Sequence, residues 1–92
     1  MLQPDTEQLN LWASRFLEHR ERLLSLARRN LNPNLLKRVS AEDVVQDTLS
    51  AACGKIGFFE NNPEIPVYFK LRTILFQTIS AMERRHLQSQ KR

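Results

Sequence analysis

The sequence predicts an all-α domain, a small bundle of three main helices plus a short connecting helix. Apolar residues recur at intervals of three and four over three long stretches, which is the spacing of a buried helix face. No stretch alternates apolar and polar residues over a useful length, so no strand is predicted. The 92 residues are expected to form one domain over residues 1–92 with a modest core, because a chain of this size buries only about two thirds of its unfolded surface.

The first stretch predicts one continuous helix over about residues 6–31, with Asp5 or Thr6 as its cap. Its apolar face is formed by Leu9, Trp12, Ala13, Phe16, Leu17, Leu23, Leu24, Ala27 and Leu31. Charged residues of both signs lie between them, which is typical of a solvated helix surface. The helix should end before Pro33, because proline pushes the preceding residue out of the α region. A short helix is then expected over about residues 34–38.

The second stretch predicts a helix over residues 41–53. Ser40 can cap its start, and Asp43 three residues later completes a short-armed capping box. The apolar face is formed by Ala41, Val44, Val45, Thr48, Leu49 and Ala52, and the opposite face by Asp43, Gln46, Asp47 and Ser50. In a basic protein, such an acidic and amide face is either ordinary solvated surface or a docking surface for a basic partner.

A loop is expected over residues 54–65, because Gly54 and Gly57 are helix-stop signals. The third main helix should follow over residues 66–90, with Pro66 in its first turn. Its buried positions are Val67, Tyr68, Leu71, Ile74, Leu75, Ile79 and Met82. Phe69 and Phe76 project from nearly the opposite side. They either pack on another helix or form a stacking surface for unpaired bases beside positive charge.

The charge of the chain is concentrated at its end. The formal net charge is +4 and the sequence pI is about 9.8. Residues 1–64 hold eight Lys and Arg against nine Asp and Glu, whereas residues 65–92 hold six against one. This distribution favours an anionic partner for the last helix. The alternative for the most basic part, Glu83 to Arg92, is a frayed and solvated C-terminus.

Composition also argues against several classes of protein. The single cysteine, Cys53, excludes an internal disulfide and fits a reducing compartment. No apolar run approaches the roughly 20 residues of a membrane span, and the N-terminus lacks a signal-peptide core. We therefore expect a cytoplasmic protein without a membrane partner. We expect no enzyme, metal or cofactor, because His19 and His86 lack neighbours at ligand spacing and no glycine-rich phosphate loop is present.

The run AEDVVQDTL, from Ala41 to Leu49, resembles the central helix of region 2 in bacterial sigma factors of the extracytoplasmic-function (ECF) group of the sigma-70 family. The flanking order is similar: a leading stretch with ARRNL-P comes before it, and a final helix ending ERRHLQSQKR comes after it. The resemblance covers the chain from about Leu9 onward. It implies a sigma region 2-like bundle that serves as the promoter-recognition module of an alternative sigma factor, which starts transcription and carries out no catalysis itself.

The resemblance implies two sites. The helix over 41–53 would dock on the basic clamp helices of the largest subunit of core RNA polymerase, through the polar face of Asp43, Gln46, Asp47 and Ser50. Capping and solvation are the alternative role of these side chains. The final helix and the preceding loop would hold the melted minus-ten element on the single-stranded non-template strand. The matching positions are Asn61, Asn62, Lys70, Arg72, Phe76, Gln77, Arg84 and Arg85.

The chain also departs from the family pattern. Members commonly carry tryptophan at the position of Lys70, asparagine at Gln77 and aspartate at Ala81, which puts base preference and melting efficiency in question. No second DNA-binding domain follows Arg92, which favours a fragment of a longer chain over a single-domain protein. An anti-sigma factor is a further partner that the family would allow.

Two other function classes stay open. A stand-alone helix-turn-helix regulator would explain the helices and the basicity, although residues 54–66 are long for its turn. A protein-binding helical module would make the basic tail incidental. Binding to duplex DNA would favour the regulator, and indifference to nucleic acid would favour the module.

Overall fold

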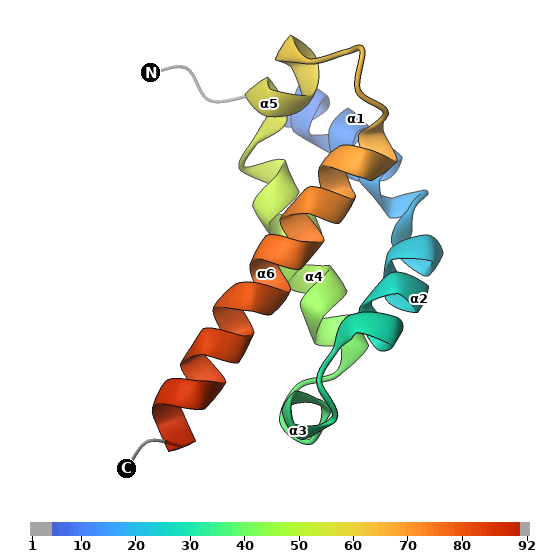
Figure 1. The fold of residues 1–92 in the computed structure, drawn as a ribbon. Coiled ribbons are helices and arrows are strands. Elements are labelled where there is room, and N and C mark those ends of the chain that lie inside the picture. Colours follow the sequence, from blue (N-terminus) through green and yellow to red (C-terminus); the bar gives the residue numbers. More distant parts are fainter. Residues whose placement is uncertain (1–4, 91–92) are drawn as a thin grey trace.

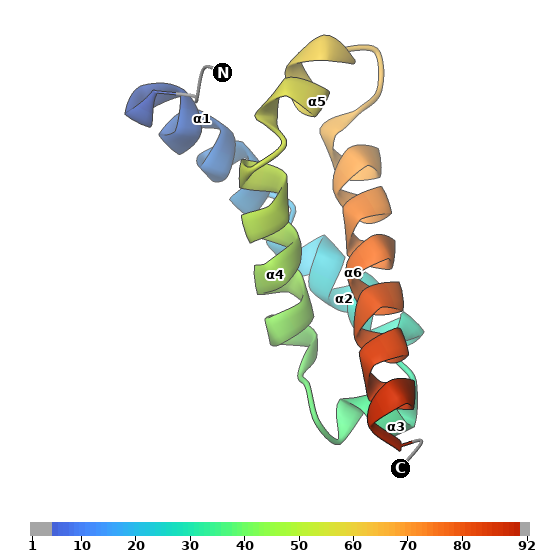
Figure 2. The same cartoon turned by 90° about the vertical axis from the view of Figure 1, so that its left-hand side faces the viewer.

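The computed structural model describes residues 5–90, and this part of the chain is all-α, as predicted, with no strand. Its helices are α1 (Thr6–Leu17), α2 (Arg20–Asn30), α3 (Pro33–Leu36), α4 (Ala41–Cys53), α5 (Ile56–Asn61) and α6 (Val67–Gln90). Helices α4 and α6 lie side by side and run in opposite directions, and α1 and α2 pack on both of them (Figures 1 and 2). Helix α5 lies at one end of this pair and α3 at the other (Figure 1).

The core is one cluster formed by the apolar faces of these helices. Its most deeply buried large side chains are Phe16, Leu23, Val44, Val45, Phe59, Leu71 and Leu75. Phe16 and Phe59 have ring centroids 4.6 Å apart, and Trp12 lies 5.7 and 5.6 Å from them. These tilted contacts join α1 to α5, and aromatic pairs of this kind add about 0.5–1.5 kcal/mol each beyond simple burial.

The prediction of one continuous helix over residues 6–31 is wrong. The chain turns at Glu18 and His19, where the His19 N–H donates to the carbonyl of Phe16 instead of the residue one position earlier. The bend allows α1 and α2 to contact α4 and α6 in different directions (Figure 1). Tertiary packing therefore overrides a local pattern that favours an unbroken helix. Leu9 and Leu17, which were expected to be buried, are exposed.

The predicted loop over residues 54–65 is also partly wrong, because it contains α5. Ile56 and Phe59, three residues apart, are buried on one side of this short helix. Their burial outweighs the helix-breaking tendency of Gly57, where an added Cβ would meet only the Asn61 side-chain nitrogen, at 4.0 Å. Gly54 does end α4, as predicted.

Most other boundary predictions are confirmed. The Ser40 hydroxyl accepts from the Asp43 N–H, and the Asp43 carboxylate accepts from the Ser40 N–H, both at 3.1 Å. The short helix expected over about residues 34–38 is present but shifted, since it starts at Pro33 with Asn32 as its cap and ends at Leu36. The last main helix begins one residue after Pro66 and continues to Gln90.

Candidate functional site

The polar face of α4 is exposed to solvent. Asp43, Gln46, Asp47 and Ser50 are all exposed, and they lie on the side opposite the buried Val44, Val45 and Thr48. Asp43 already accepts the Ser40 N–H, so part of its hydrogen-bonding capacity serves the start of the helix. The structure thus places the four predicted docking residues on one accessible surface, with capping as an established role of Asp43.

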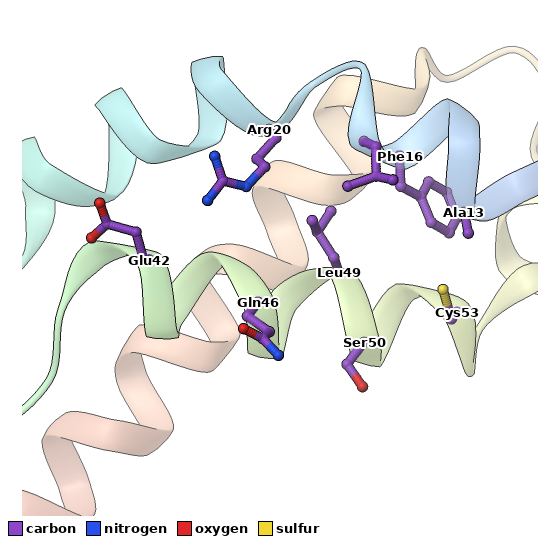
Figure 3. Close-up of a pocket in the computed structure, with 9 residues that line it drawn as sticks. Ala13, Phe16, Arg20, Glu42, Gln46, Leu49, Ser50 and Cys53 are labelled. Carbon is purple, nitrogen blue, oxygen red and sulfur yellow. The ribbon is translucent and has the colours of Figure 1, made fainter.

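A groove of about 390 Å³ runs beside this face, between α4 and the α1–α2 bend. Gln46 and Ser50 line it, together with the apolar residues Ala13, Phe16, Leu17 and Leu49 (Figure 3). Cys53 lies at one end, and burial raises the pKa of its thiol above the ordinary range. The groove was not predicted, because Leu17 was expected to lie in the core, whereas it is 56% exposed.

The outer face of α6 carries exposed aromatic rings beside arginine. Phe69 is 47% exposed and Phe76 is 36% exposed, so neither packs in the core. The Arg72 guanidinium carbon lies 5.8 Å from the Phe69 ring centroid and 6.0 Å from that of Phe76. Neither ring belongs to the core cluster, which argues against the interpretation that they pack on another helix and favours an exposed stacking surface.

A shallow depression of about 440 Å³ lies on this face. Its lining residues are Arg72, Thr73, Phe76, Gln77, Ser80 and Arg84. The structure thus brings together Arg72, Phe76, Gln77 and Arg84 from the predicted DNA-binding set. No carboxylate lines the depression, so its electrostatic character is basic. Thr73 and Ser80 also line the depression and were absent from the predicted set, although their spacing of three and four from Phe76 and Gln77 could have identified them.

Three predicted DNA-binding residues have other surroundings. Asn61 is exposed at the end of α5, whereas the half-buried Asn62 caps that helix by donating from its side chain to the Phe58 carbonyl at 2.8 Å. Arg85 is exposed but does not line the depression.

Lys70 is the clear correction to the predicted DNA-binding set. It is 2% exposed, and its ammonium donates to backbone carbonyls at the end of α5. A side chain buried in this way cannot reach a phosphate. The apolar spacing of α6 places position 70 beside the buried Leu71, which indicates a buried residue. The charge of lysine led instead to its assignment to the surface.

Neither a metal site nor a membrane-spanning helix is found in residues 5–90. Among residues 5–90, no group of three or more His, Cys, Asp or Glu side chains is arranged to hold a metal ion. No helix in the same range combines the length and apolar character required to cross a membrane.

Comparison with known proteins adds no relative, since no family model, curated protein or solved structure matches the chain.

Proposed function

We propose that the chain is the promoter-recognition module of an alternative sigma factor, which docks on core RNA polymerase through α4 and binds the melted minus-ten element through α6. The observation that carries this proposal is the presence of two chemically opposite surfaces on one pair of packed helices. The α4 face carries two carboxylates and an amide, and the α6 face is aromatic and basic with no carboxylate in its depression. The run AEDVVQDTL contributes Asp43, Gln46 and Asp47 to the first of these surfaces.

The α4 face has the chemistry to meet a basic helix. Carboxylates accept charge-assisted hydrogen bonds from arginine, and these bonds are shorter and stronger than those between neutral groups. Asp47 is fully available for this role, and Gln46 and Ser50 add donors and acceptors along the groove. Such contacts give a helix partner a fixed register. This arrangement supports docking on the basic clamp helices of the polymerase.

The α6 face has the chemistry to hold unpaired bases. Phe69 and Phe76 are separated by about 10 Å along the helix axis, which accommodates two or three stacked nucleotides at about 3.4 Å each. Aromatic stacking contributes about 1–3 kcal/mol per base and does not depend strongly on sequence. Arg72 and Arg84 at the same depression can neutralise phosphates. Gln77 offers an amide to a base edge.

The test uses two reciprocal variants of the purified chain. Gln46→Ala/Asp47→Ala removes the α4 docking groups and leaves the Ser40–Asp43 capping box intact. Arg72→Ala/Phe76→Ala removes the α6 groups. We expect the first variant to lose binding to a polymerase fragment that carries the clamp helices and to keep binding to single-stranded minus-ten DNA, and the second to do the reverse. Each variant is the folding control for the other.

Binding should be weak, because each assay offers one surface a single partner and gains no affinity from two linked contacts. Measurements should therefore extend to hundreds of micromolar, where contacts worth about 5 kcal/mol still register. Failure of the folded wild-type chain to bind the clamp fragment at these concentrations would reject the docking half of the proposal.

Other outcomes would select an alternative. Preference for duplex DNA would favour a helix-turn-helix regulator. The turn from α4 to α5 is short enough for such a motif, but α5 spans six residues and its only charged side chain, Glu60, bonds to α1. Indifference to all nucleic acid would favour a protein-binding module.

A further inference from the structure

The side chain of Lys70 connects α6 to the end of α5. Its Nζ donates to the Phe59 carbonyl at 3.0 Å and to the Asn62 carbonyl. The rings of Phe58 and Phe59 lie 5.8 and 5.5 Å from the same atom. Lys70 is 2% exposed, and among residues 5–90 no carboxylate pairs with it.

The Phe59 carbonyl lacks the backbone partner that a helix normally provides. In a helix, each carbonyl accepts from the N–H four residues later. For Phe59 that residue is Pro63, which has no N–H to donate. The Lys70 ammonium therefore supplies a hydrogen bond that the sequence prevents the backbone from making. The Asn62 carbonyl accepts from the Ile65 N–H at 3.1 Å, and Lys70 adds a second donor to it.

A buried cation is costly unless its donors are satisfied. Glu60, the acidic residue of α5, lines the same cavity as Lys70 but forms no ion pair with it, and its carboxylate accepts from Gln8 and Trp12 on α1. The carbonyls and aromatic faces provide the environment that holds the charge. Lys70 and the end of α5 thus depend on each other.

We propose that Lys70 is a positioning residue that fixes the loop Asn62–Pro66, together with the end of α5, relative to the aromatic and basic face of α6. The loop enters α6 three residues before Phe69. Its placement therefore determines where Asn61 and the exposed Phe58 lie next to bases that stack on this face. The effect of Lys70 on DNA binding rests on the proposed function. Its effect on the position of the loop rests on the structure alone.

Lys70→Met is the test variant, because methionine preserves the length and apolar stem but cannot donate. Lys37→Met is the matched control, since it removes the same charge from an exposed residue next to α3, at the opposite end of the molecule (Figure 1). Hydrogen exchange over residues 58–66 is the first readout. The unsatisfied Phe59 carbonyl should raise exchange there about tenfold, with little change in α4 and in the control.

The second readout is the affinity ratio between single strands that differ by one base of the minus-ten element. Lys70→Met should move this ratio toward one, while binding to the polymerase clamp fragment stays at the wild-type level. A purely structural role would lower all binding in parallel. If Lys70→Met leaves hydrogen exchange of the loop at the wild-type rate, the positioning role is overturned. It is also overturned if the loop exchanges faster but the affinity ratio between the two strands stays at the wild-type value.

A second variant covers loss of folding. If Lys70→Met does not fold, Lys70→Gln is used instead, because its neutral amide ends one bond short of the Nζ position and falls outside hydrogen-bond range of the Phe59 carbonyl. The same increase in loop exchange and change in base ratio are expected. Wild-type behaviour of that variant would overturn the inference. If the wild-type chain binds no single strand, the proposed function fails, and loop exchange alone decides the role of Lys70.

Discussion

Substitutions of Asp43 and Asp47 can distinguish two roles of α4 side chains, which are stabilising the start of the helix and docking a partner. Both are exposed aspartates on the same helix, but only Asp43 takes part in the capping box. Asp43→Ala removes the carboxylate that accepts the Ser40 N–H and leaves the Ser40 hydroxyl bond in place. The lost bond and the lost charge in the first turn together cost about 1 kcal/mol. Asp47→Ala loses neither.

Comparing the two variants removes the contribution of helix propensity to the free energy of unfolding. Alanine favours helix over aspartate by about 0.5 kcal/mol, and both substitutions gain this amount. The difference between the variants therefore isolates the cap at about 1 kcal/mol, which corresponds to about 4–8 °C in Tm for a domain of this size.

Thermal and urea unfolding, followed by far-UV circular dichroism, measure this difference. Equal melting temperatures within about 1 °C would refute the stabilising role of the capping box. Binding to the clamp fragment, measured well below either Tm, should fall for Asp47→Ala although this variant is not less stable than the wild-type chain. That result would identify docking as a property of the surface and not of folding.

Three further predictions concern the core, the thiol and the basic face. Phe16→Ala should lower the free energy of unfolding by about 3–5 kcal/mol, and an unchanged urea midpoint would contradict the core assignment. Because burial raises the pKa of Cys53, iodoacetamide should alkylate the folded chain more slowly than the urea-unfolded chain, and stability should fall as pH rises through and above the ordinary thiol range. Equal alkylation rates would contradict this shift. Arg84→Ala should reduce the salt dependence of single-strand binding by about 0.7 in log–log slope, whereas Arg29→Ala on α2 should leave that slope unchanged.

Local sequence information predicted the features that depend on a few neighbouring residues. The Ser40–Asp43 capping box requires one polar residue and one acidic residue three positions apart, and both contacts form. The buried face of α6 follows from apolar spacing, and Phe69 and Phe76 fall outside it as the same spacing requires.

Features that depend on distant contacts could not be predicted in this way. The bend at His19 forms because two halves of one amphipathic stretch meet different helices. Helix α5 exists because Ile56 and Phe59 have a core to enter. Lys70 was assigned to a surface because lysine is rarely buried, and its true partners come from residues eight and eleven positions away.

The indole of Trp12 allows the contact between α1 and α5 to be followed by fluorescence. Trp12 is the only tryptophan in the chain, and its Nε1–H donates to the Glu60 carboxylate at 3.3 Å. Its ring lies against Phe59 and under the Arg15 guanidinium. Tryptophan emission therefore reports on the α1–α5 contact without an added label. A ligand that displaces α5 should shift the emission spectrum, whereas one that binds only the far end of α6 should leave it unchanged.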